Sequence, residues 1–440
     1  MSDEALELEA ALRAATAGAS AALSRALSGH ELSLGEATQL AGARGADLAA
    51  LVAVADHLRR EQVGDTLTYV VNRNINFTNV CVKSCHFCAF SRDSRSEQGY
   101  FLPREEVVRR AVEARDLGAT EVCLQAGLAP GMDPRHYAEL CRAVKAAAPE
   151  LHLHAFSPEE IKYGARLAGV TPRELLIELR DAGLGSLPGT SAEVLVPEVR
   201  ERIARGRIRV EEWLEVVRTA HELGIPTTAT LMFGHVESAE HRARHLLTLR
   251  ELQAATGGFT ELVPLAFVHE EAPLFARQLD PEVEGGPGAD TVTATFALAR
   301  VVLGTRLPNL QVSWVKHGFA EAARLLGAGA NDLGGTLINE SISTSAGAHF
   351  GQLASPAKLR ALAREAGRLP AERDTRYRVL RRFGADASAD PLDPLDALSP
   401  EEAAARFGSY AELAASQRYR FELRRRPGRA TTTGADATRE

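Results

Sequence analysis

Three cysteines are crowded into eight residues of the chain, Cys81, Cys85 and Cys88, with the spacing Cys-x3-Cys-x2-Cys. Thiolates on one short loop can bind three irons of a four-iron cluster. The fourth iron then keeps an open position, which a catalytic metal centre needs for a cofactor or substrate. The amino and carboxylate groups of S-adenosylmethionine suit this position, and an electron from the cluster can break its carbon–sulfur bond. We therefore expect these cysteines to hold a [4Fe-4S] cluster that works with S-adenosylmethionine as a radical initiator.

A zinc site is the alternative interpretation of the same loop. Zinc needs four ligands, and His86 lies between the cysteines. However, the sequence has no second pair of cysteines or histidines at zinc-finger spacing. The other two cysteines, Cys123 and Cys141, fall in a strand-like and a helix-like segment, where we expect small buried hydrophobic residues. The missing second pair favours iron over zinc. Phe87 would give a cluster an apolar wall and is expected to contact the cofactor.

The segments that must position this loop alternate between short apolar runs and longer helical patterns. Strands are predicted at residues 69–79, 121–125, 151–156, 186–187, 227–232, 261–265, 311–315 and 332–333. Helices are predicted at residues 103–118, 134–148, 171–183, 210–223, 238–256, 289–304 and 318–327. This alternation predicts an α/β fold, a (β/α)8 TIM-type barrel, with a doubly wound open sheet as the alternative. The cysteine loop directly follows the first strand, at the end of the barrel where ligands bind.

Composition divides the chain into three parts. Residues 1–66 are rich in Ala, Leu, Glu and Arg, which predicts an N-terminal helical extension. Residues 67–377 contain the predicted barrel core. Residues 378–440 predict a variable C-terminal extension, with a linker, one or two helices around residues 399–424, and a disordered end.

Composition also excludes several classes of function. The chain has 440 residues, of which 45% are hydrophobic, enough to bury the core of one barrel with additions. A net charge of −7 gives no reason to expect nucleic acid as a partner. No apolar run is long enough to span a membrane, and the acidic N-terminus lacks the basic start of a signal peptide. Five cysteines do not make a disulfide framework, so we expect a cytoplasmic protein.

The segments around the cysteines resemble a known enzyme family. Residues Asn74–Cys81 and Cys85–Phe90 resemble the radical SAM enzymes called 5-amino-6-(D-ribitylamino)uracil–L-tyrosine 4-hydroxyphenyl transferases. Further segments similar to this family are Gly118–Gln125, His154–Ile161, Leu187–Glu193, Met232–His235, Val263–Leu265, Ser313–Lys316 and Gly329–Thr336. The resemblance runs from about residue 20 to Tyr377 and implies a radical SAM barrel.

The resemblance implies a reaction. The deoxyadenosyl radical would take a hydrogen from the amino group of L-tyrosine, whose Cα–Cβ bond would then break. The 4-hydroxybenzyl fragment would add to 5-amino-6-(D-ribitylamino)uracil and leave 2-iminoacetate, on the route to the deazaflavin F0 of coenzyme F-420. A separate radical SAM deazariboflavin synthase and an electron donor protein are the implied partners.

Two alternatives of different kinds remain open. Aminofutalosine synthase and dehypoxanthine futalosine cyclase, both of menaquinone biosynthesis, share the cysteine motif. The segments Gly329–Thr336 and His154–Pro158 count against such a sister enzyme. An interaction protein stabilised by zinc is the alternative from another class.

Cofactor-binding residues are expected just after the second and fourth strands. The family likeness implies that Gln125 and Gly127 lie beside S-adenosylmethionine, with the glycine allowing close backbone approach. Glu193 is expected to accept hydrogen bonds from the ribose hydroxyls, its alternative being an acid at a helix start.

Catalytic side chains are expected where later strands end. His154 and His235 end or follow a strand and are predicted to point into the barrel mouth, the alternative for each being a core histidine. Lys316 is predicted to meet a carboxylate or phenol, the alternative being a side chain that extends to the rim.

The sequence departs from the family pattern at three places. Ala126 stands where the family usually has the first of two glycines, Asn339 stands in a usual pair of acids, and Thr344 replaces a frequent arginine. These departures concern contacts to the substrate rather than the radical step.

Overall fold

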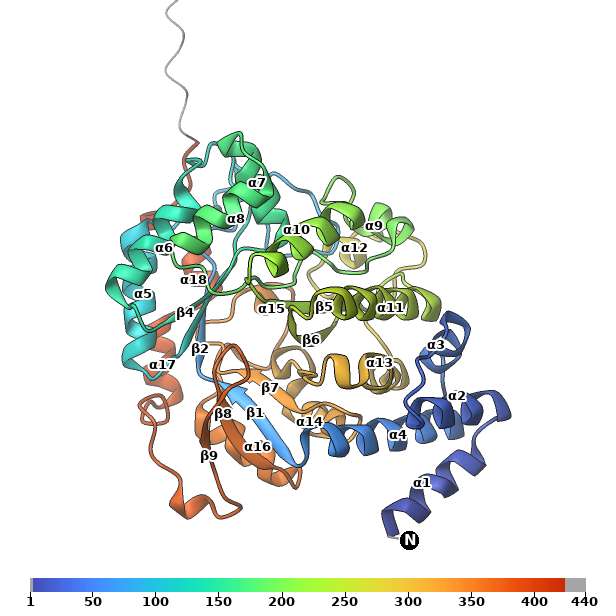
Figure 1. The fold of residues 1–440 in the computed structure, drawn as a ribbon. Coiled ribbons are helices and arrows are strands. Elements are labelled where there is room, and N and C mark those ends of the chain that lie inside the picture. The colour runs from blue at the N-terminus through green and yellow to red at the C-terminus, as the bar shows by residue number, and fades with distance from the viewer. Residues whose placement is uncertain (1–2, 424–440) are drawn as a thin grey trace, which may run out of the picture.

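Parallel strands occupy the middle of the molecule, and helices surround them (Figure 1). The computed structural model describes residues 3–423. The strands are β1 (Thr66–Val70), β2 (Asn72–Ile75), β3 (Glu121–Leu124), β4 (His152–Ala155), β5 (Thr227–Phe233), β6 (Phe259–Ala266), β7 (Asp332–Gly335), β8 (Leu369–Arg373) and β9 (Val379–Arg382).

Parallel pairing passes from each strand to the next along the chain. β2 pairs with β3 and β3 with β4. Isolated bridges at residues 186 and 187 connect β4 to β5, which pairs with β6. Further bridges at residues 310 and 311 connect β6 to β7, and β7 pairs with β1, the strand that runs on into β2. This order is that of an α/β TIM-type fold rather than of a doubly wound open sheet.

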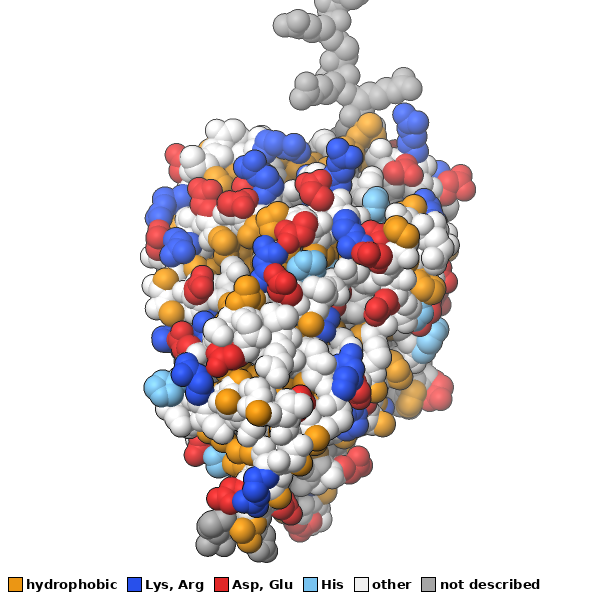
Figure 2. All heavy atoms as spheres, turned by 90° about the vertical axis from the view of Figure 1, so that its right-hand side faces the viewer, with side chains coloured by type: hydrophobic (Ala, Val, Ile, Leu, Met, Phe, Trp, Pro, Cys, Tyr) orange, Lys and Arg blue, Asp and Glu red, His pale blue; other side chains and the backbone are white. Residues whose placement is uncertain are grey.

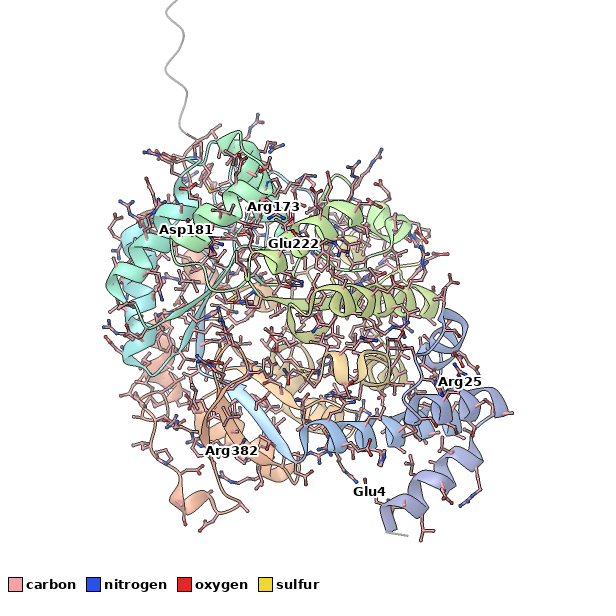
Figure 3. The ribbon with its side chains drawn as sticks, in the orientation of Figure 1. Glu4, Arg25, Arg173, Asp181, Glu222 and Arg382 are labelled. Atoms are coloured by element: carbon pink, nitrogen blue, oxygen red, sulfur yellow. The ribbon has the colours of Figure 1, made fainter. Side chains whose placement is uncertain are left out.

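Helices cover the outside of the strands. Those of the strand–helix units are α5 (Arg104–Asp116), α6 (His136–Ala147), α7 (Pro158–Ala168), α8 (Pro172–Asp181), α9 (Pro197–Ile203), α10 (Val210–Glu222), α11 (Ala239–Thr256), α12 (Pro273–Ala276), α13 (Ala289–Leu303), α14 (Trp314–Leu326), α15 (Ile342–Ser345) and α16 (Pro356–Glu365). Neighbouring helices are also joined by charge: Arg173 of α8 forms an ion pair with Glu222 of α10, and Figure 3 shows the two side by side.

The N-terminal residues form the predicted helical extension. Its helices are α1 (Asp3–Ala14), α2 (Ala17–Leu27), α3 (Leu34–Ala41) and α4 (Gly45–Val63). They lie at one edge of the molecule, where α4 packs against α13 and α3 against α11 (Figure 1). Figure 2 shows this side of the protein, on which acidic and basic side chains are interspersed. From Asp3 to Leu423, no helix is both long and apolar enough to span a membrane.

The last two strands were not predicted from the sequence. β8 lies parallel beside β1, and β9 pairs antiparallel with β8, so this hairpin crosses the predicted boundary at residue 377. The sequence of β8 contains a proline and two charged residues, which are uncommon in strands, so the strand was not predicted. The strand predicted at 311–315 is not formed: isolated parallel bridges at Leu310 and Gln311 stand in its place, and α14 already begins at Trp314.

The C-terminal extension contains two helices, α17 (Pro400–Phe407) and α18 (Tyr410–Ala415), inside the range predicted for them. Three short 3-10 turns complete the structure, Gly304–Arg306, Ala387–Ala389 and Gln417–Tyr419. The predicted disordered end beyond residue 423 lies outside the described residues.

A buried ion pair ties β8 to β7. Arg373 donates from Nε to Asp332 Oδ2 over 2.6 Å and from Nη2 to Oδ1 over 2.9 Å, and both side chains are buried. Arg373→Met would leave this carboxylate without its cation, so we expect the free energy of unfolding to fall by about 3–5 kcal/mol. Urea unfolding measures the change, with the exposed Arg382→Met as the matched control. Equal stability of the two variants would contradict this account.

Candidate active site

A cavity of about 400 Å³ lies inside the strands, and residues from nearly every strand line it. The structure brings most of the sequence-predicted site residues to this one cavity. They are Cys81, Cys85, Phe87, Cys88, Gln125, Gly127, His154, Glu193 and Lys316. His235 is the predicted site residue that does not line it.

The cysteine loop is held by backbone hydrogen bonds on both sides. The Cys81 amide donates to the Arg92 carbonyl over 2.9 Å, and the Val82 amide donates to the Leu128 carbonyl over 2.9 Å. All three cysteines are free thiols. The ring Nδ1 of His86 lies 3.1 Å from the Arg202 carbonyl at the end of α9, so this ring is engaged outside the loop.

The three thiols fit an iron–sulfur cluster. Across residues 3–423, no three Cys, His, Asp or Glu side chains gather around one point as a single metal ion would need. A four-iron cluster makes no such demand, because each thiolate binds a different iron. Burial raises the pKa of the Cys85 thiol to about 12, and the Arg207 guanidinium opposes this rise. A cation beside three thiols favours their thiolate form, which is the form that binds iron.

Gly127 is required by the backbone that leads into the loop. Its amide donates to the Thr78 carbonyl over 2.9 Å. A Cβ at this position would lie 2.3 Å from the Val80 carbonyl oxygen. The close approach expected for a cofactor is therefore also an approach to the residue just before Cys81.

Gly127→Ala should displace the cysteine loop. We expect a loss of about 1–3 kcal/mol in stability, because backbone atoms must move to admit the methyl group. Iron content after anaerobic reconstitution and thermal unfolding would measure the effect. The neighbouring Ala126→Gly is the matched control, and normal iron loading of Gly127→Ala would refute the steric argument.

The carboxylate of Glu160 holds the loop after β3 by hydrogen bonds. The Ala126 amide donates to Glu160 Oε1 over 3.1 Å, and the Ser157 amide donates to Oε2 over 2.7 Å. Burial raises the pKa of Glu160 to about 7. Gln125 donates from Nε2 to Thr190 Oγ1 over 3.0 Å. Glu160 therefore positions the predicted cofactor-binding residues, and it also caps the start of α7 together with Ser157.

Glu193 carries a free oxygen into the cavity wall. Its backbone has a φ of 43°, and its Oε1 accepts from Arg207 Nη1 over 2.6 Å. Its Oε2 is buried and has no hydrogen-bond partner in the described part of the chain. Because a buried carboxylate oxygen without a partner is costly, this atom suits a ligand hydroxyl.

Arg207 is a cavity residue that the sequence analysis missed. Its guanidinium lies 5.6 Å from the centre of the Phe87 ring and 3.6 Å from a carboxylate oxygen of Glu159. The charges of Glu193 and Cys85 raise its pKa against the lowering effect of burial. Arg207 stands in a stretch with several arginines and after no strand, so its sequence position gave no signal.

The two predicted histidines lie in different places, one in the cavity lining and one outside it. His154 lines the cavity from β4 and is buried, with Nδ1 2.7 Å from the Ser186 hydroxyl. His235 is buried outside the cavity, where its Nδ1 accepts from the Val236 amide over 2.7 Å and its ring meets Phe267 edge-on at 5.9 Å. Gly234, with a φ of 88°, turns the chain after β5, so His235 does not point into the barrel mouth as expected.

Lys316 brings an ammonium group to the cavity. It lies in the first turn of α14, and its ammonium group forms no hydrogen bond or ion pair with residues 3–423. Burial lowers its pKa, and the charge of Glu340 opposes this. Glu340 itself accepts from the Ser343 amide over 2.7 Å and the Thr344 amide over 3.2 Å. Lys316 is therefore a cation available for a ligand anion.

Two other residues depart from their expected places. Cys123, expected in the core, is half-buried on β3 and lines the cavity, whereas Cys141 is fully buried in α6 as expected. Asn339 does not line the cavity: its Nδ2 donates to the Phe407 carbonyl over 2.6 Å, which ties the C-terminal extension to the barrel. The asparagine that departs from the family pattern therefore has a structural role, because it binds the C-terminal extension.

Two solved structures share the fold over most of this chain. The FeFe-hydrogenase maturase HydG from Carboxydothermus hydrogenoformans has a TM-score of 0.64 at 17% identity, covering 85% of this chain and 84% of that one. Methylornithine synthase has a TM-score of 0.57 at 18% identity, covering 76% of this chain and 88% of that one. At these identities the likeness concerns the fold alone.

Two family models match the chain. Residues 75–249 match the radical SAM superfamily, and residues 256–384 match the CofH/MqnC C-terminal region. An α/β TIM-type fold with its cysteine loop at the carboxyl ends of the strands, together with the first match, defines a radical SAM protein.

Curated relatives narrow this class. The 5-amino-6-(D-ribitylamino)uracil–L-tyrosine 4-hydroxyphenyl transferase of Methanothermobacter thermautotrophicus is 47% identical over 345 residues, covering 78% of this chain and 93% of that protein. The enzyme of the same name from Methanopyrus kandleri is 48% identical over 331 residues, covering 74% and 88%. The FO synthase of Mycobacterium tuberculosis is 48% identical over 79% of this chain, which spans only 40% of that protein. The chain belongs to the family of 5-amino-6-(D-ribitylamino)uracil–L-tyrosine 4-hydroxyphenyl transferases.

Proposed function

We propose that this protein transfers the 4-hydroxybenzyl group of L-tyrosine to 5-amino-6-(D-ribitylamino)uracil in the biosynthesis of F0. One observation carries the proposal: a single cavity gathers the cysteine triad, the partnerless Glu193 oxygen and the unpaired Lys316 ammonium. The relatives that match most of the chain bear the name of this activity, which further supports it. The menaquinone enzymes are the second candidate, supported only by the shared cysteine motif.

The cofactors would be held by one wall of the cavity. Cys81, Cys85 and Cys88 would ligate a [4Fe-4S] cluster, and Arg207 would balance the negative charge of its thiolates. Glu193 would accept hydrogen bonds from the ribose of S-adenosylmethionine through its free oxygen. When bound, this pair supplies the deoxyadenosyl radical that removes a hydrogen from the substrate. The predicted contacts of Gln125, Gly127 and Phe87 with S-adenosylmethionine remain part of the proposal.

Tyrosine would be held by the opposite wall. Lys316 would bind its carboxylate and fix the amino group beside the cofactors. Val263, Leu265 and Val315 also line the cavity and would pack against the phenol ring. An apolar wall excludes water from the fragment that leaves tyrosine, which protects it from side reactions.

The wider assignment is part of the same proposal. The eight strand positions would act as one closed (β/α)8 barrel within residues 67–377, between the helical extension 1–66 and the extension 378–440. A separate radical SAM deazariboflavin synthase would complete the ring system, and an electron donor protein would reduce the cluster. A reducing cytoplasm would keep the five free cysteines as thiols.

An anaerobic substrate-omission assay tests the function. The reconstituted and reduced protein is incubated with S-adenosylmethionine, tyrosine and the ribitylaminouracil, and each component is omitted in turn. We expect 5′-deoxyadenosine, 2-iminoacetate or its breakdown products, and an adduct mass only when all components are present. Cleavage of S-adenosylmethionine with a menaquinone precursor, and no tyrosine adduct, would favour the second candidate.

A further inference from the structure

The lower part of the barrel interior is polar. Alternate residues of a strand face the same side, and on β6 the residues Glu261, Val263 and Leu265 all line the cavity. On β3 and directly after it, the corresponding residues are Glu121, Cys123 and Gln125. On both strands the residue farthest from the cysteine loop is therefore an acid. Bulky branched apolar side chains usually fill this layer of a TIM-type barrel.

We call this region the polar floor, and its residues lie on strands or beside them and line the same cavity. They are Asn72, Glu121, His154, Glu261 and Gln311. Asn72 and Glu121 are the first residues of β2 and β3, and Gln311 is bridged to the first residue of β7. The floor is thus built by several strands around the lower end of one cavity.

Part of the floor is already paired within the protein. Asn72 donates from Nδ2 to Glu121 Oε1 over 2.8 Å. Glu261 Oε2 accepts from the Tyr377 hydroxyl and lies 3.4 Å from Arg373 Nη2. Since Arg373 is also bound by Asp332, its charge is already balanced. The floor therefore offers no free cation to a ligand anion.

Three polar groups of the floor remain unpaired. His154 Nε2, Glu261 Oε1 and the side-chain amide of Gln311 have no hydrogen-bond partner among residues 3–423. His154 is only 7% exposed and lines the cavity, so its free nitrogen faces this interior space. All three residues line the cavity and these groups have no partner within the protein, so a bound ligand can complete their hydrogen bonds.

The unpaired groups match a hydroxyl-rich ligand. A hydroxyl can donate to a carboxylate and can both donate to and accept from an imidazole or an amide. Tyrosine, by contrast, ends in charged groups, and its carboxylate finds an unpaired ammonium at Lys316 instead. From Glu121 to Gln125 the strand rises about 13 Å, so a chain with a ring at one end can extend from floor to rim.

We propose that the polar floor binds the ribityl chain of the acceptor, with Glu261, His154 and Gln311 as specificity-determining residues. This inference rests on the proposed function and adds the orientation of the acceptor within the barrel. The ribityl chain points down the barrel, and the uracil ring stands at the level of the cysteine loop. The carbon that receives the benzyl group thereby faces the place where tyrosine is cleaved.

Calorimetric binding of two stable probes tests this orientation on the anaerobically reconstituted protein. The probes are 6-(D-ribitylamino)uracil and 6-(methylamino)uracil, which differ in the ribityl hydroxyls. The wild type should bind the ribityl probe more tightly. Gln311→Leu should weaken the ribityl probe about tenfold and leave the methyl probe unchanged. Glu261→Gln is the second variant, and the exposed Gln417→Leu is the matched control.

The outcomes separate this inference from the proposed function. Equal loss for both probes, or no loss for either, would overturn the orientation. A rise in the tyrosine KM of Gln311→Leu, with the acceptor KM unchanged, would assign the floor to tyrosine and also overturn it. Failure of the wild type to form 5′-deoxyadenosine with tyrosine would refute the proposed function, while the two-probe comparison would still report on the floor.

Discussion

Cys85→Ala is expected to abolish radical formation while the protein stays folded. Cys85 is the buried member of the triad and lines the cavity beside the charge of Arg207. Changes around a metal ligand cost about 10- to 100-fold in metal affinity or activity, so loss of a ligand should cost more than about 100-fold. We expect little iron after reconstitution and no 5′-deoxyadenosine above background. Iron analysis and visible absorbance measure the first effect, and chromatography of the products measures the second.

Cys141→Ala is the matched control for this variant. It also removes a buried free thiol, but from α6, outside the cavity. It should load iron and form 5′-deoxyadenosine like the wild type. Normal activity of Cys85→Ala, or equal loss in both variants, would contradict a cluster at the cysteine loop.

Lys316→Met is expected to impair the use of tyrosine. The substitution keeps an unbranched side chain of similar length and removes the unpaired ammonium of the cavity. A hydrogen bond to a charged group is worth about 1.5–3 kcal/mol, so the KM for tyrosine should rise about 10- to 150-fold. The KM for the ribitylaminouracil should change little, because that substrate has no carboxylate. Steady-state kinetics with each substrate varied in turn provides the comparison.

Lys358→Met serves as the control for the loss of a lysine charge. Its ammonium lies 3.8 Å from the centre of the Phe319 ring, on α16 and away from the cavity lining. It should leave both KM values unchanged. An unchanged tyrosine KM in Lys316→Met, with a raised KM for the acceptor, would place the carboxylate elsewhere and Lys316 beside the uracil.

The sequence predicted the parts of the site that depend on position along a strand. The cysteine loop, Gln125, Gly127 and Glu193 follow strand ends, and parallel strands bring such residues to one edge. The strand at 261–265 was also predicted, because it is a short run of mostly apolar residues. These signals are local, so the sequence alone contains them.

The parts that could not be predicted depend on contacts between distant segments. Arg207 reaches the cavity from a loop, and Glu160 looks like a helix cap until its bond to Ala126 is known. The sequence of β8 contains charged residues, so it resembles a polar surface segment. Its Arg373 can be buried in a strand because it pairs with Asp332, a distant residue of the sequence. The predicted position of His235 in the barrel mouth was wrong for a similar reason. Gly234 turns the chain after β5, and the pattern of strand residues does not predict that turn.

The most direct test of the account follows the benzylic carbon of tyrosine. Reduced, reconstituted protein is incubated with S-adenosylmethionine, the ribitylaminouracil and tyrosine labelled with carbon-13 at Cβ. The account predicts an adduct that carries the label, formed in step with 5′-deoxyadenosine, and no such product with Cys85→Ala. Accumulation of 5′-deoxyadenosine while the label stays in intact tyrosine would contradict the proposed transfer.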